Sequence, residues 1–104
     1  MNAQDEYTLD DFIAEERERD PKFRKVWDES QDERELGDVL IDSRLASHMT
    51  QQELSAKTGV SQGDISRIER AIANPSLKTL KRLADAMGMR VKISFEPKPT
   101  QAQL

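Results

Sequence analysis

The chain has 104 residues, no cysteine and a formal net charge of −4, and 35% of its residues are charged. This length allows one small domain with an extension, and the lack of cysteine excludes a disulfide framework and a thiol nucleophile. The sequence contains neither an apolar run of about 18 residues nor a basic-then-apolar leader, so we expect a soluble cytoplasmic protein without membrane contact.

The charges are divided unevenly along the chain. Residues 1–35 contain 13 acidic and 6 basic residues, whereas residues 36–95 contain 6 acidic and 9 basic residues. This asymmetry predicts two parts with different partners, an acidic arm followed by a basic domain. An alternative is that the acidic arm only keeps the protein in solution.

The arm carries two short helical patterns. Thr8 can cap a first helix with Asp11 three residues later, and Asp20 followed by Pro21 can begin a second. Apolar residues recur in both patterns at helical spacing, and they are Leu9, Phe12, Ile13, Phe23, Val26 and Trp27. Each stripe is too short to form its own core, so it must pack on the following domain or on a separate protein with a basic surface. The charge contrast between arm and domain favours the separate protein.

The first helix of the domain is expected from about residue 32, with Leu36 and Leu40 pointing inward. Its start is difficult to place, because Gly37 weakens the helical pattern and either Asp32 or Asp38 could be the cap. The arm and the domain could therefore be continuous or hinged at this point.

Two short helical patterns lie on either side of Gly59, and their tight connection indicates a helix-turn-helix. Thr50 and Ser61 can cap the two helices, while glycine is suited to the left-handed corner between them. In the second helix Ile65 and Ile68 are expected to point inward.

The outward side of this second helix carries small, amide-bearing and cationic residues. An α-helix fits the major groove of DNA, where amide and guanidinium groups pair with base edges. The candidates for base contacts are Gln62, Gly63 and Arg67. The candidates for phosphate contacts, which set the register on DNA, are Thr50, Gln51, Ser61, Ser66, Arg70 and Lys78.

A further helix is expected from the cap Ser76 to Gly88, and the pattern then changes. Val91, Ile93 and Phe95 alternate with polar residues, which predicts a half-buried strand over 90–96. A lone strand has unpaired edges, so the same segment of a second copy or a sheet edge of another protein could pair with it. Residues 97–104 are expected to be disordered.

The segment TQQELSAKTGVSQGDISRIERAIANPSLKTLKRLADAMGM resembles the DNA-binding domain of the Xre family, which includes the lambda-type repressors. The turn glycine, the apolar positions, the Ile-Glu pair and the Asn-Pro-Ser corner match that pattern together. The resemblance implies an all-α, lambda repressor-like helix-turn-helix bundle over residues 32–89. It also implies that Arg44 and Glu69, which stand at matching positions, form a largely buried salt bridge.

The whole chain, with an acidic helical arm over 1–31, this domain and a terminal strand, resembles HigA-like antitoxins of type II toxin–antitoxin operons. The resemblance implies a homodimer that binds double-stranded operator DNA and represses its own operon. It further implies that the arm neutralises a basic, RelE-like or HigB-like mRNA interferase toxin. A solitary Xre-type repressor, whose arm packs on its own domain, remains the alternative.

An enzyme is the least favoured class. The paired carboxylates Asp10–Asp11 and Glu15–Glu16 are adjacent in a helical pattern, so the members of each pair would not face each other. The sequence has no glycine-rich phosphate loop, no cluster of metal ligands and no nucleophile with a base. We therefore predict no catalytic residue, no metal and no cofactor.

Overall fold

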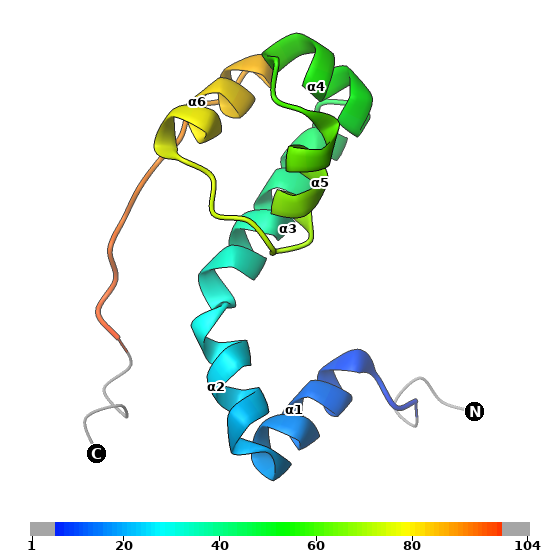
Figure 1. Ribbon diagram of the computed structural model, residues 1–104, viewed down its shortest axis with the longest axis vertical. Coiled ribbons are helices and arrows are strands. Elements are labelled where there is room, and N and C mark those ends of the chain that lie inside the picture. The colour runs from blue at the N-terminus through cyan, green and yellow to red at the C-terminus, as the bar shows by residue number, and fades with distance from the viewer. Residues whose placement is uncertain (1–5, 99–104) are drawn as a thin grey trace.

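The computed structural model describes residues 6–98, which form six α-helices and no strand (Figure 1). The helices are α1 (Leu9–Arg19), α2 (Pro21–Glu29), α3 (Gln31–Ala46), α4 (Gln51–Thr58), α5 (Gln62–Glu69) and α6 (Leu77–Ala86). These six helices confirm the predicted all-α bundle.

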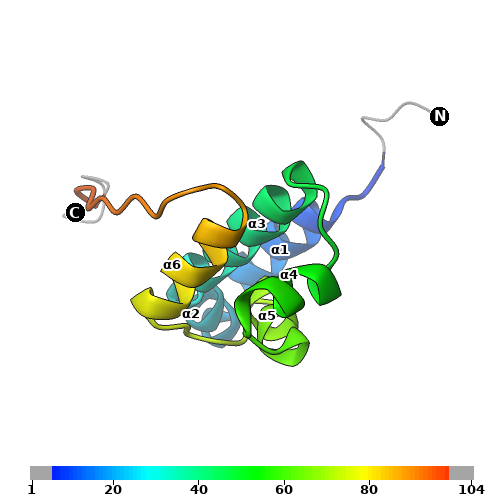
Figure 2. The same cartoon turned by 90° about the horizontal axis from the view of Figure 1, so that it is seen from above.

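The core lies in the domain formed by α3 to α6, where α4, α5 and α6 lie on one side of α3 (Figure 2). Helix α3 packs against α5, and α4 packs against both α5 and α6. The buried apolar side chains are Leu40, Leu54, Val60, Ile65, Ile68 and Leu83. Because five of these six side chains come from helices, the core depends on how the helices cross.

The crossing of α3 and α5 depends on Gly37. A Cβ atom at this position would lie 2.7 Å from the carbonyl oxygen of Glu69 and 2.9 Å from that of Ile68. Only a residue without a Cβ allows the two backbones to approach this closely. The glycine that weakened the helical pattern is therefore a contact point inside a continuous α3.

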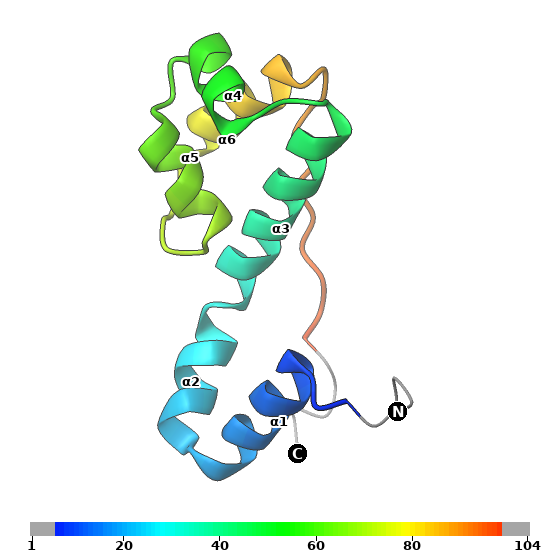
Figure 3. The same cartoon turned by 90° about the vertical axis from the view of Figure 1, so that its right-hand side faces the viewer.

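The start of α3 differs from both expected caps. Ser30 is its N-cap residue and makes no side-chain capping bond, while Asp32 and Glu33 follow in the first turn. Only Ser30 separates α3 from α2, so the two helices follow one another along nearly one line (Figure 3). The arm and the domain are joined by this one-residue break.

The corner between α4 and α5 forms as the sequence predicts. Gly59 has a φ of 78° in the left-handed region, and its N–H donates to the carbonyl oxygen of Ser55. Ser61 then accepts a hydrogen bond from the Asp64 N–H at 3.0 Å, so its hydroxyl caps α5. These bonds fix the angle between α4 and α5.

The arm folds as a helical hairpin in which α1 lies back against α2 (Figure 3). Arg17 Nε and Nη2 donate to the two carboxylate oxygens of Asp28, at 3.0 and 3.1 Å, across the hairpin. Phe23 and Trp27 stack with their ring centroids 5.8 Å apart, and α2 in turn packs against α3. The two stripes are thus partly covered inside the arm, whereas the sequence predicted that they pack on the domain or on a separate protein.

The expected strand over 90–96 is wrong for the chain that the structure describes. No strand forms between residues 6 and 98. The segment therefore has no neighbouring strand with which its backbone could form ladder hydrogen bonds. It leaves α6 as an extended segment alongside the domain (Figure 1). Disorder was predicted for residues 97–104, and residues 99–104 lie outside the described part of the chain.

None of the helices in the described part of the chain is both long and apolar enough to cross a membrane.

Candidate functional site

The three candidate base-contacting residues lie together on α5. Gln62 and Gly63 occupy the first turn of this helix, Arg67 follows one turn later, and all three are exposed. In helix-turn-helix proteins the first turn of the second helix meets the base edges in the major groove. The position and exposure of these residues are therefore suited to base contacts.

Two hydroxyl groups lie at helix N-termini in the same motif. Thr50 Oγ1 accepts the Glu53 N–H at 3.0 Å, and Ser61 Oγ accepts the Asp64 N–H at 3.0 Å. Both side chains are exposed, and each hydroxyl keeps its own hydrogen for donation to a phosphate oxygen. The positive ends of α4 and α5 add favourable electrostatics for an anion.

The predicted salt bridge between Arg44 and Glu69 is present. Arg44 Nε and Nη2 donate to the two carboxylate oxygens of Glu69 at 2.8 and 3.1 Å, and the side chains are 13% and 6% exposed. Arg44 Nη1 also donates to the carbonyl oxygen of Met49 at 2.9 Å. This nearly buried pair joins α3 to the end of α5 and to the loop before α4.

Gln51 takes part in the same network. Its Nε2 donates to Glu69 Oε1 at 2.9 Å, and the side chain is half-buried. Sequence reasoning missed this bond, because Gln51 and Glu69 are 18 residues apart. Gln51 thus links the N-terminus of α4 to the C-terminus of α5.

Opposing effects set the ionisation of this network. Burial by itself raises the pKa of Glu69, but the hydrogen bonds from Arg44 and Gln51 and the charge of Arg44 together lower it below the ordinary value of 4.5. The hydrogen bond to Glu69 raises the pKa of Arg44. The pair is therefore fully ionised at neutral pH.

Arg67 is paired with Asp64, which lies three residues earlier on α5. The guanidinium extends back over Gly63, since a Cβ at Gly63 would lie 3.6 Å from Arg67 Nη1. Neither contact was predicted from the sequence. The pair neutralises the anion that Asp64 places on the outward side of α5.

The remaining phosphate candidates are more widely spread. Arg70 follows α5 as its exposed C-cap residue, with its Nε 3.4 Å from the carbonyl oxygen of the half-buried Ser66. Lys78 is exposed in the first turn of α6, and no contact joins it to the other candidates among the described residues. The site is consequently concentrated at the start of α4 and along α5.

The arm presents a second, different surface. Three of the six apolar side chains in its two stripes are exposed: Leu9 by 72%, Phe12 by 45% and Val26 by 66%. The other three, Ile13, Phe23 and Trp27, are half-buried in the hairpin. Each stripe is thus divided into an inward part that holds the arm together and an outward part that faces solvent.

An acidic pocket of about 360 Å³ lies where the arm meets the domain. It is lined by Glu29 and Glu33 from the junction of α2 and α3, with Val26 beside them and the α5–α6 loop opposite. One carboxylate oxygen of Glu33 is buried and has no hydrogen-bond partner among the described residues. Sequence reasoning had no signal for this pocket, because it combines distant segments.

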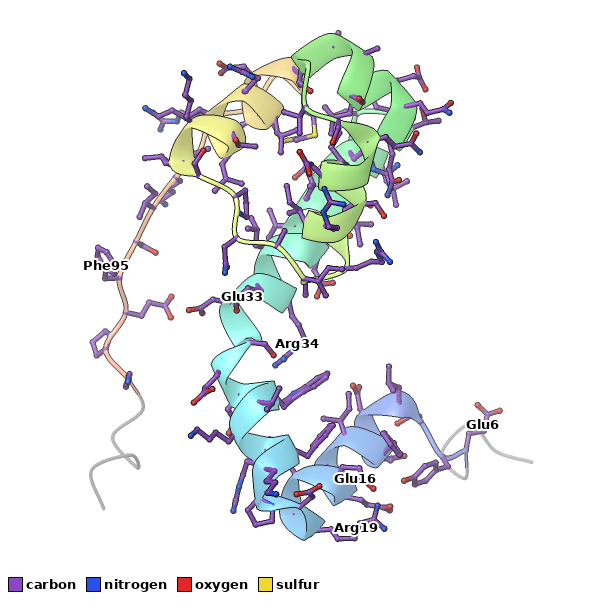
Figure 4. All side chains as sticks on the ribbon, viewed as in Figure 1. Glu6, Glu16, Arg19, Glu33, Arg34 and Phe95 are labelled. Carbon is purple, nitrogen blue, oxygen red and sulfur yellow. The ribbon has the colours of Figure 1, made fainter. Side chains whose placement is uncertain are left out.

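An apolar groove of about 620 Å³ separates α3 from α6 and from residues 89–94. Leu36 and Val39 of α3 and Leu80 of α6 line it, together with Val91 and Ile93. Phe95 lies beyond the groove and is 97% exposed, pointing away from the domain (Figure 4). Of the three candidate dimer residues, only Val91 is half-buried, whereas Ile93 is 62% exposed.

Comparisons with known proteins agree with the geometry of the domain. A helix-turn-helix family matches residues 40–92. Two curated proteins named Antitoxin HigA1, from Mycobacterium tuberculosis strains CDC 1551 / Oshkosh and ATCC 25618 / H37Rv, are each 33% identical to this chain over 85 residues. The alignment covers 82% of this chain and 57% of each relative, so the chain spans little more than half their length. No solved structure matches the chain.

The family and the relatives indicate a regulator rather than an enzyme.

Proposed function

Because the chain belongs to the helix-turn-helix family and is similar to Antitoxin HigA1, we propose that it is an antitoxin that binds both DNA and a toxin. Its domain binds operator DNA, and its arm binds a basic toxin of the RelE or HigB type. The observation that carries this proposal is the separation of two exposed surfaces, a polar one on α5 with amide and guanidinium groups and an acidic, apolar one on the arm. Both activities belong in the bacterial cytoplasm, where operator DNA lies.

The DNA-binding half of the proposal rests on α5. Gln62 and Arg67 offer the amide and guanidinium groups that pair bidentately with adenine and guanine edges. Thr50, Ser61 and Arg70 offer donors to the phosphates on either side. The buried pair of Arg44 and Glu69 holds this helix at a fixed position and does not contact bases.

The toxin-binding half rests on the outward face of the arm. Leu9, Phe12 and Val26 remain exposed although α1 and α2 are folded, so they are free to fill hydrophobic pockets of another protein. The acidic pocket with Glu29 and Glu33 adjoins Val26 and suits a basic partner. In a solitary repressor with a packed arm, these apolar side chains would instead be covered by the domain.

The dimeric form of the proposal rests on the C-terminal segment. Ile93 and Phe95 are exposed next to the apolar groove between α3 and α6, and a second copy could cover both surfaces. A two-fold dimer would present two copies of α5 to an inverted repeat, with half-sites about one helical turn of DNA apart. Autorepression follows if that repeat lies in the promoter of the protein's own operon.

Toxin binding is tested by co-expression with the small basic protein encoded beside this gene. We expect the wild type to retain that protein during affinity purification and the variant Leu9→Ser/Phe12→Ser/Val26→Ser to lose it. Leu45→Ser is the matched control, because Leu45 is an apolar side chain that is 58% exposed on the domain. Retention by the triple variant would contradict the arm assignment, provided that circular dichroism shows the same helix content.

DNA binding is tested by gel shift with the upstream region of the same gene. We expect Gln62→Ala/Arg67→Ala to lose roughly 2–6 kcal/mol of preference for this DNA over random DNA. Arg24→Ala is the control, since it removes an exposed cation from the arm. Unchanged preference in the double variant would contradict the assignment of these two residues to bases.

A further inference from the structure

Helix α5, which we propose to be the DNA recognition helix, carries a carboxylate on its outward side. The presence of an anion on a surface that would face DNA requires a physical reason. Asp64 lies in the first turn of α5, and its side chain is 55% exposed. An unpaired carboxylate there would be repelled by DNA phosphates and would oppose binding. In the structure the carboxylate is paired with Arg67, whose side chain is 49% exposed.

The pairing adds little to folding. Exposed ion pairs at this helical spacing contribute only a few tenths of a kcal/mol, because water and salt screen them. The consequence of the pair lies in where it places the guanidinium. Side chains on a helix point toward its N-terminus, and Asp64 draws Arg67 one turn back in that direction.

Gly63 leaves room for this placement. The Arg67 nitrogens Nη1 and Nη2 lie 3.6 and 3.9 Å from the point where a Cβ of Gly63 would be. The guanidinium therefore covers the one position of the first turn that has no side chain of its own. In helix-turn-helix proteins this turn approaches the base edges.

We propose that Asp64 is a positioning residue, which holds the Arg67 guanidinium over Gly63 so that Arg67 reads a guanine. Asp64 Oδ1 occupies one N–H group of Arg67 Nη2, and a guanidinium has five N–H groups in all. Enough donors remain for the O6 and N7 acceptors of guanine. A fixed guanidinium discriminates better than a mobile one, because it cannot shift to suit another base.

This inference rests on the proposed operator binding and adds a residue and a base to it. The test uses the full chain and duplexes enriched from a randomised DNA pool, with affinities measured by fluorescence anisotropy. Each guanine of the preferred duplex is replaced in turn by 7-deazaguanine, which lacks the N7 acceptor. We expect one position at which this replacement weakens wild-type binding about tenfold or more.

Substitutions then separate positioning from simple charge. Asp64→Ala should abolish most of the response to 7-deazaguanine, whereas Asp64→Glu should restore part of it. Asp85→Ala is the control for charge, since it removes an exposed carboxylate from α6. It should strengthen binding to all duplexes alike and leave the response to 7-deazaguanine unchanged.

A double-mutant cycle decides whether Asp64 acts through Arg67. In the Arg67→Ala background, Asp64→Ala should cause no further loss of guanine preference. An equal loss in both backgrounds would overturn the proposal, as would a full response to 7-deazaguanine in Asp64→Ala. If the wild type selects no preferred sequence from the pool, operator recognition itself fails and the inference fails with it.

Discussion

Arg44 and Glu69, which lie 25 residues apart, hold α3 to the end of α5 through two hydrogen bonds of 2.8 and 3.1 Å. The Glu69 side chain is 6% exposed and also accepts a hydrogen bond from Gln51. Three helices of the domain therefore meet at a single carboxylate. Its removal should affect both the stability of the domain and the placement of α5.

Replacing either member of this pair should be strongly destabilising. Arg44→Ala leaves the Glu69 charge buried without its partner, and Glu69→Gln does the same to Arg44, so we expect each to lower the free energy of unfolding by about 3–5 kcal/mol. Urea denaturation followed by circular dichroism measures the change. Arg17→Ala removes an exposed pair in the arm and should leave domain stability close to that of the wild type. A loss below about 1 kcal/mol in both pair variants would show that the pair is solvated.

The same pair predicts that the stability of the domain decreases at acidic pH. The native pKa of Glu69 lies below its ordinary value of 4.5, so the native state binds a proton less readily than the unfolded chain. The associated stabilisation is fully present above about pH 4.5 and is lost as the pH falls through the lower native pKa. In Glu69→Gln the side chain does not titrate, so this variant has no such pH-dependent stabilisation to lose. Its free energy of unfolding should therefore fall less steeply between neutral pH and about pH 3. Parallel profiles of wild type and variant would contradict this expectation.

The glycine at the α3–α5 crossing provides a third prediction. Gly37→Ala introduces a Cβ within 2.9 Å of two backbone oxygens, and we expect the forced separation of the helices to cost about 1–3 kcal/mol despite the better helix propensity of alanine. Gly63→Ala is the matched control, because its nearest contact would be an ordinary 3.6 Å. Thermal unfolding should show a lower midpoint for the first variant and an equal or higher one for the second. A stable Gly37→Ala variant would mean that the helices can separate freely.

Local patterns predicted much of this fold from the sequence. Caps such as Thr8, Asp20 and Ser61, and the turn glycine Gly59, act through bonds within a few residues and can be recognised in one dimension. The inward side of α5 also follows from spacing alone. The salt bridge of Arg44 and Glu69 came instead from the family resemblance.

Most of the features that escaped prediction depend on contacts between distant segments. The role of Gly37 is visible only when α5 crosses α3, and the bond from Gln51 to Glu69 requires both helix ends to be in place. The alternation around Ile93 is a true strand pattern, yet a strand also needs an edge to pair with, and the described chain has none. The pairing of Asp64 with Arg67 lies within reach of sequence reasoning, because the two are three residues apart on one helix.

Arg34 should control the junction between the arm and the domain. Its guanidinium carbon lies 3.6 Å from the centre of the Trp27 ring, and its Nη1 donates to the Trp27 carbonyl oxygen at 2.6 Å. Trp27 is the chain's only tryptophan, so its fluorescence reports on this place alone. Arg34→Ala should expose the ring and shift its emission to longer wavelength, whereas Arg24→Ala should not. An unchanged spectrum would show that Phe23 and the helix backbone suffice to hold the ring.

The C-terminal segment supplies the last prediction, which concerns the proposed dimer. Phe95 is 97% exposed and Ile93 is 62% exposed, and a soluble monomer gains nothing from presenting two large apolar side chains beside an apolar groove. If a second copy covers them, Ile93→Asp/Phe95→Asp places charges in the interface and should yield monomers.

Sedimentation velocity over a range of protein concentrations measures this change, because a dimer that is only weakened reappears at high concentration. Leu45→Asp inserts a charge at another exposed apolar position and should leave the dimer intact. Dimers that persist in the double variant would place the interface on a different surface. The same variant should bind an inverted repeat no more tightly than a single half-site, since one copy of α5 then meets DNA at a time.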